Sequence, residues 1–394
     1  MKVLILATDI YTRGGMARYT WTLASALGDL VGRDNVHMLT LLGRSSAGAA
    51  PKRFRILQVV ADQPTAASKF RFAAKALGLG LRKYDLVICV FVGLAPLAGI
   101  IRLLFGTPYW VCCHGIEVWN RLPLLERLAV RQANRIVPIS RFTAAKVAEM
   151  NGVPAKKIRI VYNAIPEEQA AMLGLSSEAG TCVSSNGGQK RLLSVGMLSQ
   201  ALAYKGFDTV IRALPQVLAV MPNVRYTIVG EGDNRENLRL LAAELGVSEH
   251  VEFTGEVSDA RLALLYRASD IFVLPSRAGR ACGHWEGEGF GRVYVEAALA
   301  GKPVVGSREG GAAEAVLHGE TGLLVDPRSQ TEVADALITL LETPKLAARM
   351  GREGQRWARK NFTESALQNR LREMLGGAYA SPEEMSTLCA EFLD

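Results

Sequence analysis

The sequence has 394 residues, of which 49% are hydrophobic and 21% are charged, and this length predicts two globular domains rather than a single core. Residues 1–170 contain 23 Lys and Arg against 10 Asp and Glu. That basic half indicates an anionic partner. The sequence has no zinc-finger spacing, RNA-binding aromatic motif or basic zipper, which argues against nucleic acid. Anionic lipid is therefore the favoured partner. Six cysteines without paired metal spacing, and a start that leads straight into a strand, predict a cytoplasmic protein with reduced thiols and no signal peptide.

Short apolar runs alternate with helical patterns along the first half of the chain. The run Val3 to Ala7 is followed by Gly14 and Gly15, and then by a helical pattern. Glycines at this point let backbone N–H groups approach an anion at the helix N-terminus, although a plain strand-to-helix corner would use the same residues. Further strands are predicted at 36–42, 56–60, 85–90, 109–113, 135–140 and 159–162, with a helix near 96–104 and Ser140 as a helix N-cap.

Residues 174–188 are polar and glycine-rich, which predicts an interdomain linker. Strands are predicted after it at 191–195, 225–229, 250–254, 271–274, 303–306 and 323–325. Strands that alternate with helices favour an α/β fold with doubly wound, Rossmann-like parallel sheets. We therefore predict an N-terminal domain at 1–173, a C-terminal domain at 189–363, and a last helix and tail at 364–394.

Two acids, Glu288 and Glu296, are separated by seven residues in the stretch EGEGFGRVYVEAALAG, residues 286–301. Gly289 and Gly291 follow the first acid, and a helical pattern carries the second. Because glycines before a helix let the backbone approach a ligand, one carboxylate can hold a polyol at the helix N-terminus and the other a hydroxyl group deeper in. Two surface glutamates beside a glycine turn would show the same pattern.

The Glu288-Gly289-Phe290-Gly291 run with Glu296 resembles the Glu-x7-Glu element of the retaining glycosyltransferases of family 4, among them bacterial mannosyl- and glucosyltransferases. The stretches GKPVV, GGAAE and GETGLLV follow in the order that this family shows. The resemblance is dense from about residue 190 to 330 and looser from 1 to 165. It implies the GT-B fold, with two Rossmann-like domains facing a central cleft.

The resemblance also implies roles for single residues. Lys205 would ion-pair with the donor diphosphate, His114 would face the donor sugar, and Gly230 would support the nucleotide cleft. A solvated lysine, a capping histidine and a polar turn are the alternative interpretations. Glu117 could contact the acceptor or be solvated. The predicted nucleotide-sugar site comprises Gly14, Gly15, Lys205, Gly230, Glu288, Gly289, Phe290, Gly291 and Glu296, with Glu288, His114 and Lys205 as its catalytic residues.

The expected mechanism follows from the same resemblance. Glu288 would orient the sugar and stabilise its oxocarbenium-like charge, while Glu296 would bind the ribose hydroxyls. The leaving phosphate would act as the base for the acceptor, and the donor's anomeric configuration would be retained. No Asp-x-Asp motif for a divalent ion occurs in the sequence. We therefore expect no metal and no cofactor, with lysine and helix N-termini holding the diphosphate.

One position departs from the family pattern. Where the family has an arginine after the glycine of the VG pair, this chain has Met197. Loss of a cation beside a diphosphate should weaken leaving-group stabilisation. Arg277, Arg280 and Arg292 from neighbouring loops, or Arg13 from the other domain, are candidates to replace it.

These observations predict a transferase that moves a hexosyl group from a nucleotide-sugar to a hydroxyl of a lipid-linked or other glycan acceptor. GDP-mannose is slightly favoured as the donor and a UDP-sugar comes next. A soluble small-molecule acceptor, and a catalytically weak sugar-nucleotide-binding partner subunit, are the alternatives.

The stretch 66–83 predicts where a membrane would be contacted. Phe70, Ala73, Leu77 and Leu81 recur at helical spacing among basic residues, so the helix could lie on anionic lipid or pack its apolar side on the sheet. A basic first domain with such a helix resembles that of family members that dock on the inner leaflet to reach lipid-linked acceptors. We expect peripheral attachment to the inner face of the cell membrane.

Overall fold

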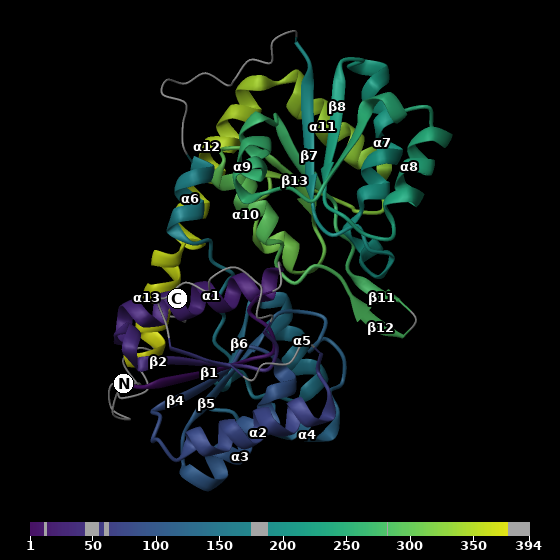
Figure 1. Ribbon diagram of the computed structural model, residues 1–394. Coiled ribbons are helices and arrows are strands. Elements are labelled where there is room, and N and C mark those ends of the chain that lie inside the picture. The colour runs from purple at the N-terminus through teal and green to yellow at the C-terminus, as the bar shows by residue number, and fades with distance from the viewer. Residues whose placement is uncertain (12–13, 44–54, 59–62, 175–187, 282, 377–394) are drawn as a thin grey trace. The chain divides into compact units, whose positions relative to one another are not determined.

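The computed structural model describes residues 1–11, 14–43, 55–58, 63–174, 188–281 and 283–376 (Figure 1). Arg13, nearly all of the predicted linker and the tail beyond residue 376 lie outside this described part. Within it, no helix combines the length and apolar character needed to cross a membrane.

The first sheet has six strands in the order β3-β2-β1-β4-β5-β6, the order of a doubly wound dinucleotide-binding fold. The pairings of β1 with β2 and β4, of β2 with β3 and of β4 with β5 are parallel. The strands are β1 (Val3–Ala7), β2 (Val36–Thr40), β3 (Arg55–Gln58), β4 (Leu86–Cys89), β5 (Tyr109–Cys113) and β6 (Arg135–Pro138). The helices between and after them are α1 (Gly15–Val31), α2 (Ala66–Gly80), α3 (Ala95–Phe105), α4 (Leu124–Gln132), α5 (Arg141–Asn151) and α6 (Glu167–Gly174), with 3-10 turns η1 (Arg33–Asn35), η2 (Val92–Leu94) and η3 (Ala155–Lys157).

The second sheet repeats this topology. Its strands are parallel in the order β14-β13-β10-β7-β8-β9, with the first strand of the series again in the middle. The strands are β7 (Lys190–Val195), β8 (Val224–Val229), β9 (Val251–Gly255), β10 (Ile271–Leu274), β13 (Val304–Ser307) and β14 (Gly322–Val325). The helices are α7 (Phe207–Val220), α8 (Arg235–Glu244), α9 (Asp259–Ala268), α10 (Arg292–Leu299), α11 (Gln330–Glu342) and α12 (Pro344–Asn361), with 3-10 turns η4 (Gln200–Lys205), η5 (Ser248–His250) and η6 (Gly310–Glu314). The prediction of two Rossmann-like parallel sheets is therefore confirmed.

The strand predicted at 159–162 is wrong. The backbone there runs beside β6, with Arg159 N–H donating to the Ile136 carbonyl at 2.9 Å and Val161 N–H donating to the Pro138 carbonyl at 3.0 Å. In a parallel ladder the residue at position 138 would donate back between these two bonds. Proline has no N–H to donate, so the pairing stops at an isolated bridge between Ile136 and Ile158.

A short antiparallel hairpin was not predicted. β11 (Gly279–Ala281) pairs with β12 (His284–Glu286) between β10 and α10, and it extends away from the strands of the second sheet (Figure 1). Three-residue strands are too short to show an alternating pattern, so periodicity gives no signal for them.

By residue contacts the chain divides into two compact units, and the boundary passes through the first sheet. The first unit contains Met1–Val111, Gln132–Arg135 and the chain from Glu364 onward, and the second contains Cys112–Arg131 and Ile136–Thr363. In the first unit, the last helix α13 (Glu364–Gly376) packs beside α1, where Gln368 donates to Asp29 at 3.0 Å. The domain limits 1–173 and 189–363 remain a prediction.

Candidate functional site

Lys205 and Glu288 form an ion pair in the second unit. The Lys205 Nζ lies 2.9 Å from the Glu288 Oε2, and the side chains are 14% and 19% exposed. Lys205 ends η4, and Gly206 follows it with a φ of +82°. A Cβ on Gly206 would lie 2.2 Å from the Pro275 carbonyl oxygen, so glycine is required for the turn that places Lys205.

Three backbone segments of the second unit meet at Gly289. A Cβ on Gly289 would lie 2.1 Å from the His114 carbonyl oxygen, and one on Gly311 would lie 1.9 Å from the Gly289 carbonyl oxygen. The Gly311 N–H also donates to the Glu288 carbonyl at 3.1 Å. Backbone packs directly on backbone here, which brings the predicted residues His114 and Glu288 onto neighbouring loops.

The loop after β5 is held by Glu117. Its carboxylate accepts a hydrogen bond from the backbone N–H of His114. This gives Glu117 a part in shaping the His114 loop, which neither sequence interpretation of Glu117 included. Burial, together with the charge of Glu117, raises the pKa of the Cys113 thiol well above its usual value, so this buried cysteine stays protonated at neutral pH.

Glu296 is the more deeply buried of the two predicted acids. Its side chain is 4% exposed, and Oε1 accepts hydrogen bonds from Arg292 Nε and Gln169 Nε2, each at 3.1 Å. Oε2 accepts from the Tyr266 hydroxyl at 3.0 Å. A buried carboxylate needs such donors, and here they come from α6, α9 and α10.

Phe290, predicted as part of the nucleotide-sugar site, belongs to a buried aromatic cluster. Its ring stacks on Tyr162 with centroids 5.4 Å apart and meets Phe362 edge-on at 5.2 Å. The side chain therefore anchors the Glu288 loop in the core. Gly291, the next residue, has a φ of +78° and is the N-cap of α10.

The acid of the GGAAE stretch caps a helix. The Glu314 carboxylate accepts hydrogen bonds from the backbone N–H groups of Arg141 and Phe142, each at 2.8 Å. These are the first residues of α5, whose N-cap is Ser140 as predicted, with its hydroxyl accepting from Thr143 N–H at 3.0 Å. A carboxylate at a helix N-terminus is favoured by the helix dipole, so Glu314 ties η6 to α5.

Met197 is 56% exposed and comes directly after the glycine that follows β7. Two candidate replacements for the family arginine have partners in the second unit. Arg277 makes a two-pronged ion pair with Asp208, each contact at 3.0 Å, and Arg292 pairs with Glu296. Arg280 is exposed on the hairpin, 5.9 Å from the centroid of a tryptophan ring.

Packing explains one of the remaining predicted glycines, Gly230, but not the other two, Gly14 and Gly15. A Cβ on Gly230 would lie 1.9 Å from the Gly196 carbonyl oxygen, so packing requires glycine there. Gly14 and Gly15, in the first unit, begin α1, and a Cβ on either would meet no atom within 4 Å. Among the described residues of the first unit, no packing contact requires glycine at 14 or 15, which leaves ligand approach open as the reason for these two.

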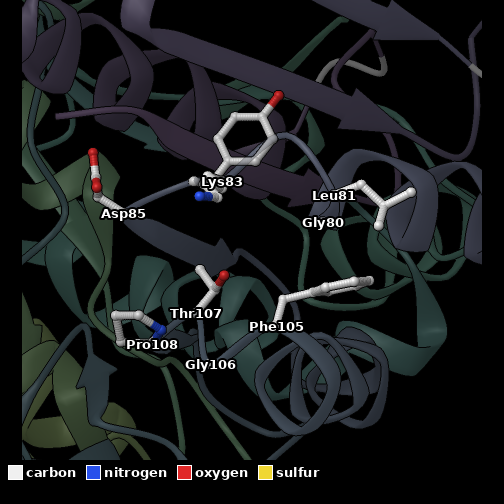
Figure 2. A pocket seen from close by; sticks show the side chains of 9 residues that line it. Gly80, Leu81, Lys83, Asp85, Phe105, Gly106, Thr107 and Pro108 are labelled. Carbon is white, nitrogen blue, oxygen red and sulfur yellow. The ribbon is translucent and has the colours of Figure 1, made fainter.

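A cavity of about 510 Å³ lies elsewhere, in the first unit (Figure 2). It is at the amino ends of β4 and β5, whereas His114 follows the carboxyl end of β5. Figure 2 shows Leu81 and Phe105 at one side of it and Asp85 at the other. Ligands of open α/β sheets bind beyond the carboxyl ends of the strands, so this cavity is not the site that the motifs predict.

The sequence interpretation missed Gln169, Tyr266 and the helix-capping role of Glu314. Gln169 and Tyr266 are far from the motif in the chain and carry no local signal. Glu314 belongs to the GGAAE stretch, but a carboxylate that caps a helix 173 residues away in the chain leaves no signal in sequence spacing.

Comparison with known proteins gives two family matches. The model described as "Glycosyltransferase Family 4" matches residues 13–169, and the one described as "Glycosyl transferases group 1" matches residues 183–357. The chain is 32% identical to a GDP-mannose-dependent alpha-(1-6)-phosphatidylinositol monomannoside mannosyltransferase of Mycolicibacterium smegmatis, over 95% of this chain and 98% of that protein. It is 30% identical to a protein of the same name from Mycobacterium tuberculosis, over 95% and 98%.

Solved structures share the fold over nearly the whole chain. The Anabaena protein HepE in complex with UDP has a TM-score of 0.77 at 22% identity and covers 96% of this chain and 100% of its own. A sucrose-phosphate synthase from Thermosynechococcus elongatus has a TM-score of 0.74 at 20% identity, with 96% and 99% covered.

Proposed function

Because this chain belongs to glycosyltransferase family 4 and has the GT-B fold, we propose that it moves a hexosyl group from a nucleotide-sugar to a hydroxyl of a lipid-linked glycan acceptor. That the protein is a glycosyltransferase follows from its family. The donor, the acceptor, the stereochemistry and the residue roles below are the proposal.

The observation that carries the proposal is the Lys205–Glu288 pair, together with the buried Glu296 of the same motif. A nucleotide-sugar has a diphosphate, a sugar and a ribose, and these groups need a cation and hydrogen-bond acceptors. Lys205 would hold the diphosphate, Glu288 the sugar, and Glu296 the ribose hydroxyls. His114, on the loop that packs against Gly289, would face the sugar.

GDP-mannose is the proposed donor, with a UDP-sugar as the next choice. The two mycobacterial relatives cited above are named as GDP-mannose-dependent enzymes, and each aligns with nearly the whole chain. The Glu288 loop and the His114 loop are both present in this structure with defined backbone contacts.

The proposed reaction retains the donor's anomeric configuration and needs no metal. The bond from the sugar C1 to the phosphate oxygen breaks while the acceptor oxygen forms its bond to C1 on the same face. The acceptor's proton moves to the leaving phosphate. Lys205 stabilises the negative charge that develops on this phosphate, and Glu288 stabilises the positive charge on the sugar.

The acceptor is proposed to lie at an anionic membrane surface. In the first unit, α2 buries Phe72, Ala76 and Leu79, which are not part of the predicted stripe. In that stripe Ala73 and Leu77 are half-buried and Leu81 is exposed. Phe70 is 75% exposed, and on α3 Leu103 is 84% exposed. Exposed apolar side chains beside basic ones are typical of surfaces that contact anionic lipid.

Met197 supports a second candidate, a nucleotide-sugar binder with weak catalysis. Its side chain is exposed where the family has a cation, and the guanidinium groups of Arg277 and Arg292 are paired with Asp208 and Glu296. A diphosphate with fewer cations around it would leave more slowly.

A transfer assay with radiolabelled donors tests both candidates. GDP-mannose, GDP-glucose, UDP-glucose and UDP-galactose are each offered with phosphatidylinositol-based lipid acceptors or soluble sugars. We expect lipid-bound product from GDP-mannose, undiminished by EDTA, with the donor's configuration by NMR. Donor binding with no transfer to any acceptor would favour the weak binder, and an inverted product or loss of activity in EDTA restored by manganese would reject the mechanism.

A further inference from the structure

Four side chains from three helices form one buried hydrogen-bonded group in the second unit. Arg292 and Glu296 are both on α10, and their ion pair is 10% and 4% exposed. Gln169 is on α6 and Tyr266 on α9. The donors on Glu296 thus come from three helices: Oε1 accepts from α10 and α6, and Oε2 accepts from α9.

Gln169 joins the members of this group to one another. Its Nε2 donates to Glu296 Oε1 at 3.1 Å, and its Oε1 accepts from Arg292 Nη2 at 2.7 Å. Arg292 Nε donates to the same Glu296 Oε1 at 3.1 Å, which closes a ring of three hydrogen bonds. The third nitrogen of Arg292 donates to the Ala164 carbonyl at 3.0 Å, so the guanidinium is fixed as well.

The two carboxylate oxygens of Glu296 differ in the number of hydrogen bonds that they accept. Oε1 accepts two hydrogen bonds, which matches the two lone pairs of a carboxylate oxygen. Among the described residues, Oε2 accepts one, from Tyr266. A ligand hydroxyl that donates to Glu296 would therefore bond to Oε2. The orientation of the carboxylate is fixed by its hydrogen bonds to Gln169, Arg292 and Tyr266.

We infer that Gln169 and Tyr266 are positioning residues for Glu296, and that through it they set the recognition of the donor's ribose hydroxyls. This inference rests on the proposed function, since it takes Glu296 as the ribose contact. Gln169 and Tyr266 act by fixing the direction of Oε2. Their loss leaves Glu296 free to turn, and the preference for a ribose over a deoxyribose falls.

The test measures binding of GDP and of 2′-deoxy-GDP by isothermal titration calorimetry. The wild type is expected to prefer GDP by about tenfold, as a site built to bond a hydroxyl rejects the analogue without it. In Gln169→Leu the preference should fall to about twofold or less, since one hydrogen bond to a charged group corresponds to roughly tenfold. Tyr266→Phe should change it in the same direction and serves if the first variant folds poorly.

Gln355→Leu is the matched control. Gln355 also bridges a neighbouring helix to α10, but its Nε2 donates to the Leu299 carbonyl at 2.8 Å and does not bond Glu296. A purely structural effect would lower the preference in both glutamine variants, whereas the inference predicts a loss in Gln169→Leu alone. In a Glu296→Gln background, Gln169→Leu should have no further effect on the ratio.

The outcomes separate the two levels of the proposal. If the wild type binds neither GDP nor UDP, the proposed function is rejected, and the inference with it. If UDP binds in place of GDP, the same comparison with 2′-deoxy-UDP applies. If the wild type binds a nucleotide and Gln169→Leu and Tyr266→Phe keep the full ribose preference, the positioning role is overturned while the proposed function stands.

Discussion

The ammonium of Lys205 and the carboxylate of Glu288 lie 2.9 Å apart, so the cation proposed for the diphosphate is bonded to the acid proposed for the sugar. A diphosphate would compete with Glu288 for Lys205. Donor binding would then free the Glu288 carboxylate for the sugar as the ammonium turns to phosphate. Under the proposed roles, the pair would couple binding of the diphosphate to binding of the sugar.

Glu288→Gln should separate binding from catalysis. Turnover should fall on the order of 100-fold, as expected for loss of a preorganised electrostatic contact. GDP should bind about fivefold more tightly, because Lys205 loses a competing anion that contributes roughly 1 kcal/mol. Steady-state kinetics and calorimetry measure the two effects. Weaker GDP binding together with near-normal turnover would show that the pair is only structural.

Met197→Arg should restore a cation near the diphosphate. We expect the donor KM to fall about threefold to tenfold, the size of one exposed to partly buried charge contact. Val220→Arg replaces another exposed apolar residue, at the end of α7, and is the control for added charge alone. Equal changes in both variants would assign the effect to net charge rather than to position 197.

Glu314→Gln should destabilise the protein without altering any proposed donor contact. The amide keeps one acceptor but loses the charge at the N-terminus of α5, which corresponds to about 1 kcal/mol. Thermal unfolding should show a midpoint lower by roughly 2 to 4 °C. Glu320→Gln, in an exposed turn, is the control and should leave the midpoint unchanged.

Gly289→Ala should disrupt the contact between the Glu288 and His114 loops. The new Cβ would lie 2.1 Å from the His114 carbonyl oxygen, and relief of such overpacking costs about 1 to 3 kcal/mol. Gly78→Ala, in α2, places its Cβ in open space and should stabilise by about 1 kcal/mol. Denaturant unfolding measures both. A Gly289→Ala protein as stable and active as wild type would exclude the backbone contact.

Replacing Lys69, Arg71 and Lys75 by serine should weaken binding to anionic vesicles. The attraction should also fall with salt, since it is screened within about 8 Å at physiological ionic strength. Replacing Lys345, Arg349 and Arg352, exposed on α12, removes the same charge from another helix and should matter less. Co-sedimentation measures the difference. If the wild type does not sediment with anionic vesicles at low salt, the soluble acceptor becomes the better proposal.

Much of the fold could be predicted because each strand is a short apolar run with a period unlike that of the helices. Val3–Ala7 and Tyr109–Cys113 begin and end at the predicted residues. The strand predicted at 159–162 fails because Pro138, in the strand beside it, lacks the donor that pairing needs. The missing hydrogen bond depends on which two segments lie side by side, so the sequence of either segment alone does not reveal it.

The site was predictable in its residues but not in their partners. Motif spacing identified Glu288, Glu296 and Lys205, yet two of the donors to Glu296, Gln169 and Tyr266, lie 127 and 30 residues away in the chain. Phe290 was assigned to the nucleotide-sugar site because it lies inside the motif, whereas its ring is buried among aromatic side chains. A motif names positions, and tertiary packing decides which way each side chain points.

Pro138 also affects the outer edge of the first sheet, where another chain could pair. β6 is the last strand of the first sheet, and the outer strand of a sheet is where a second chain can add itself by hydrogen bonding. At this edge the segment from Ile158 to Val161 takes the carbonyls of Ile136 and Pro138. A true parallel strand would also use the N–H of residue 138, which lies between these two carbonyls, and proline has none. The β6 edge of the sheet is thereby covered by the protein's own chain, and a change of Pro138 to a residue with an N–H should let the segment pair as a true strand.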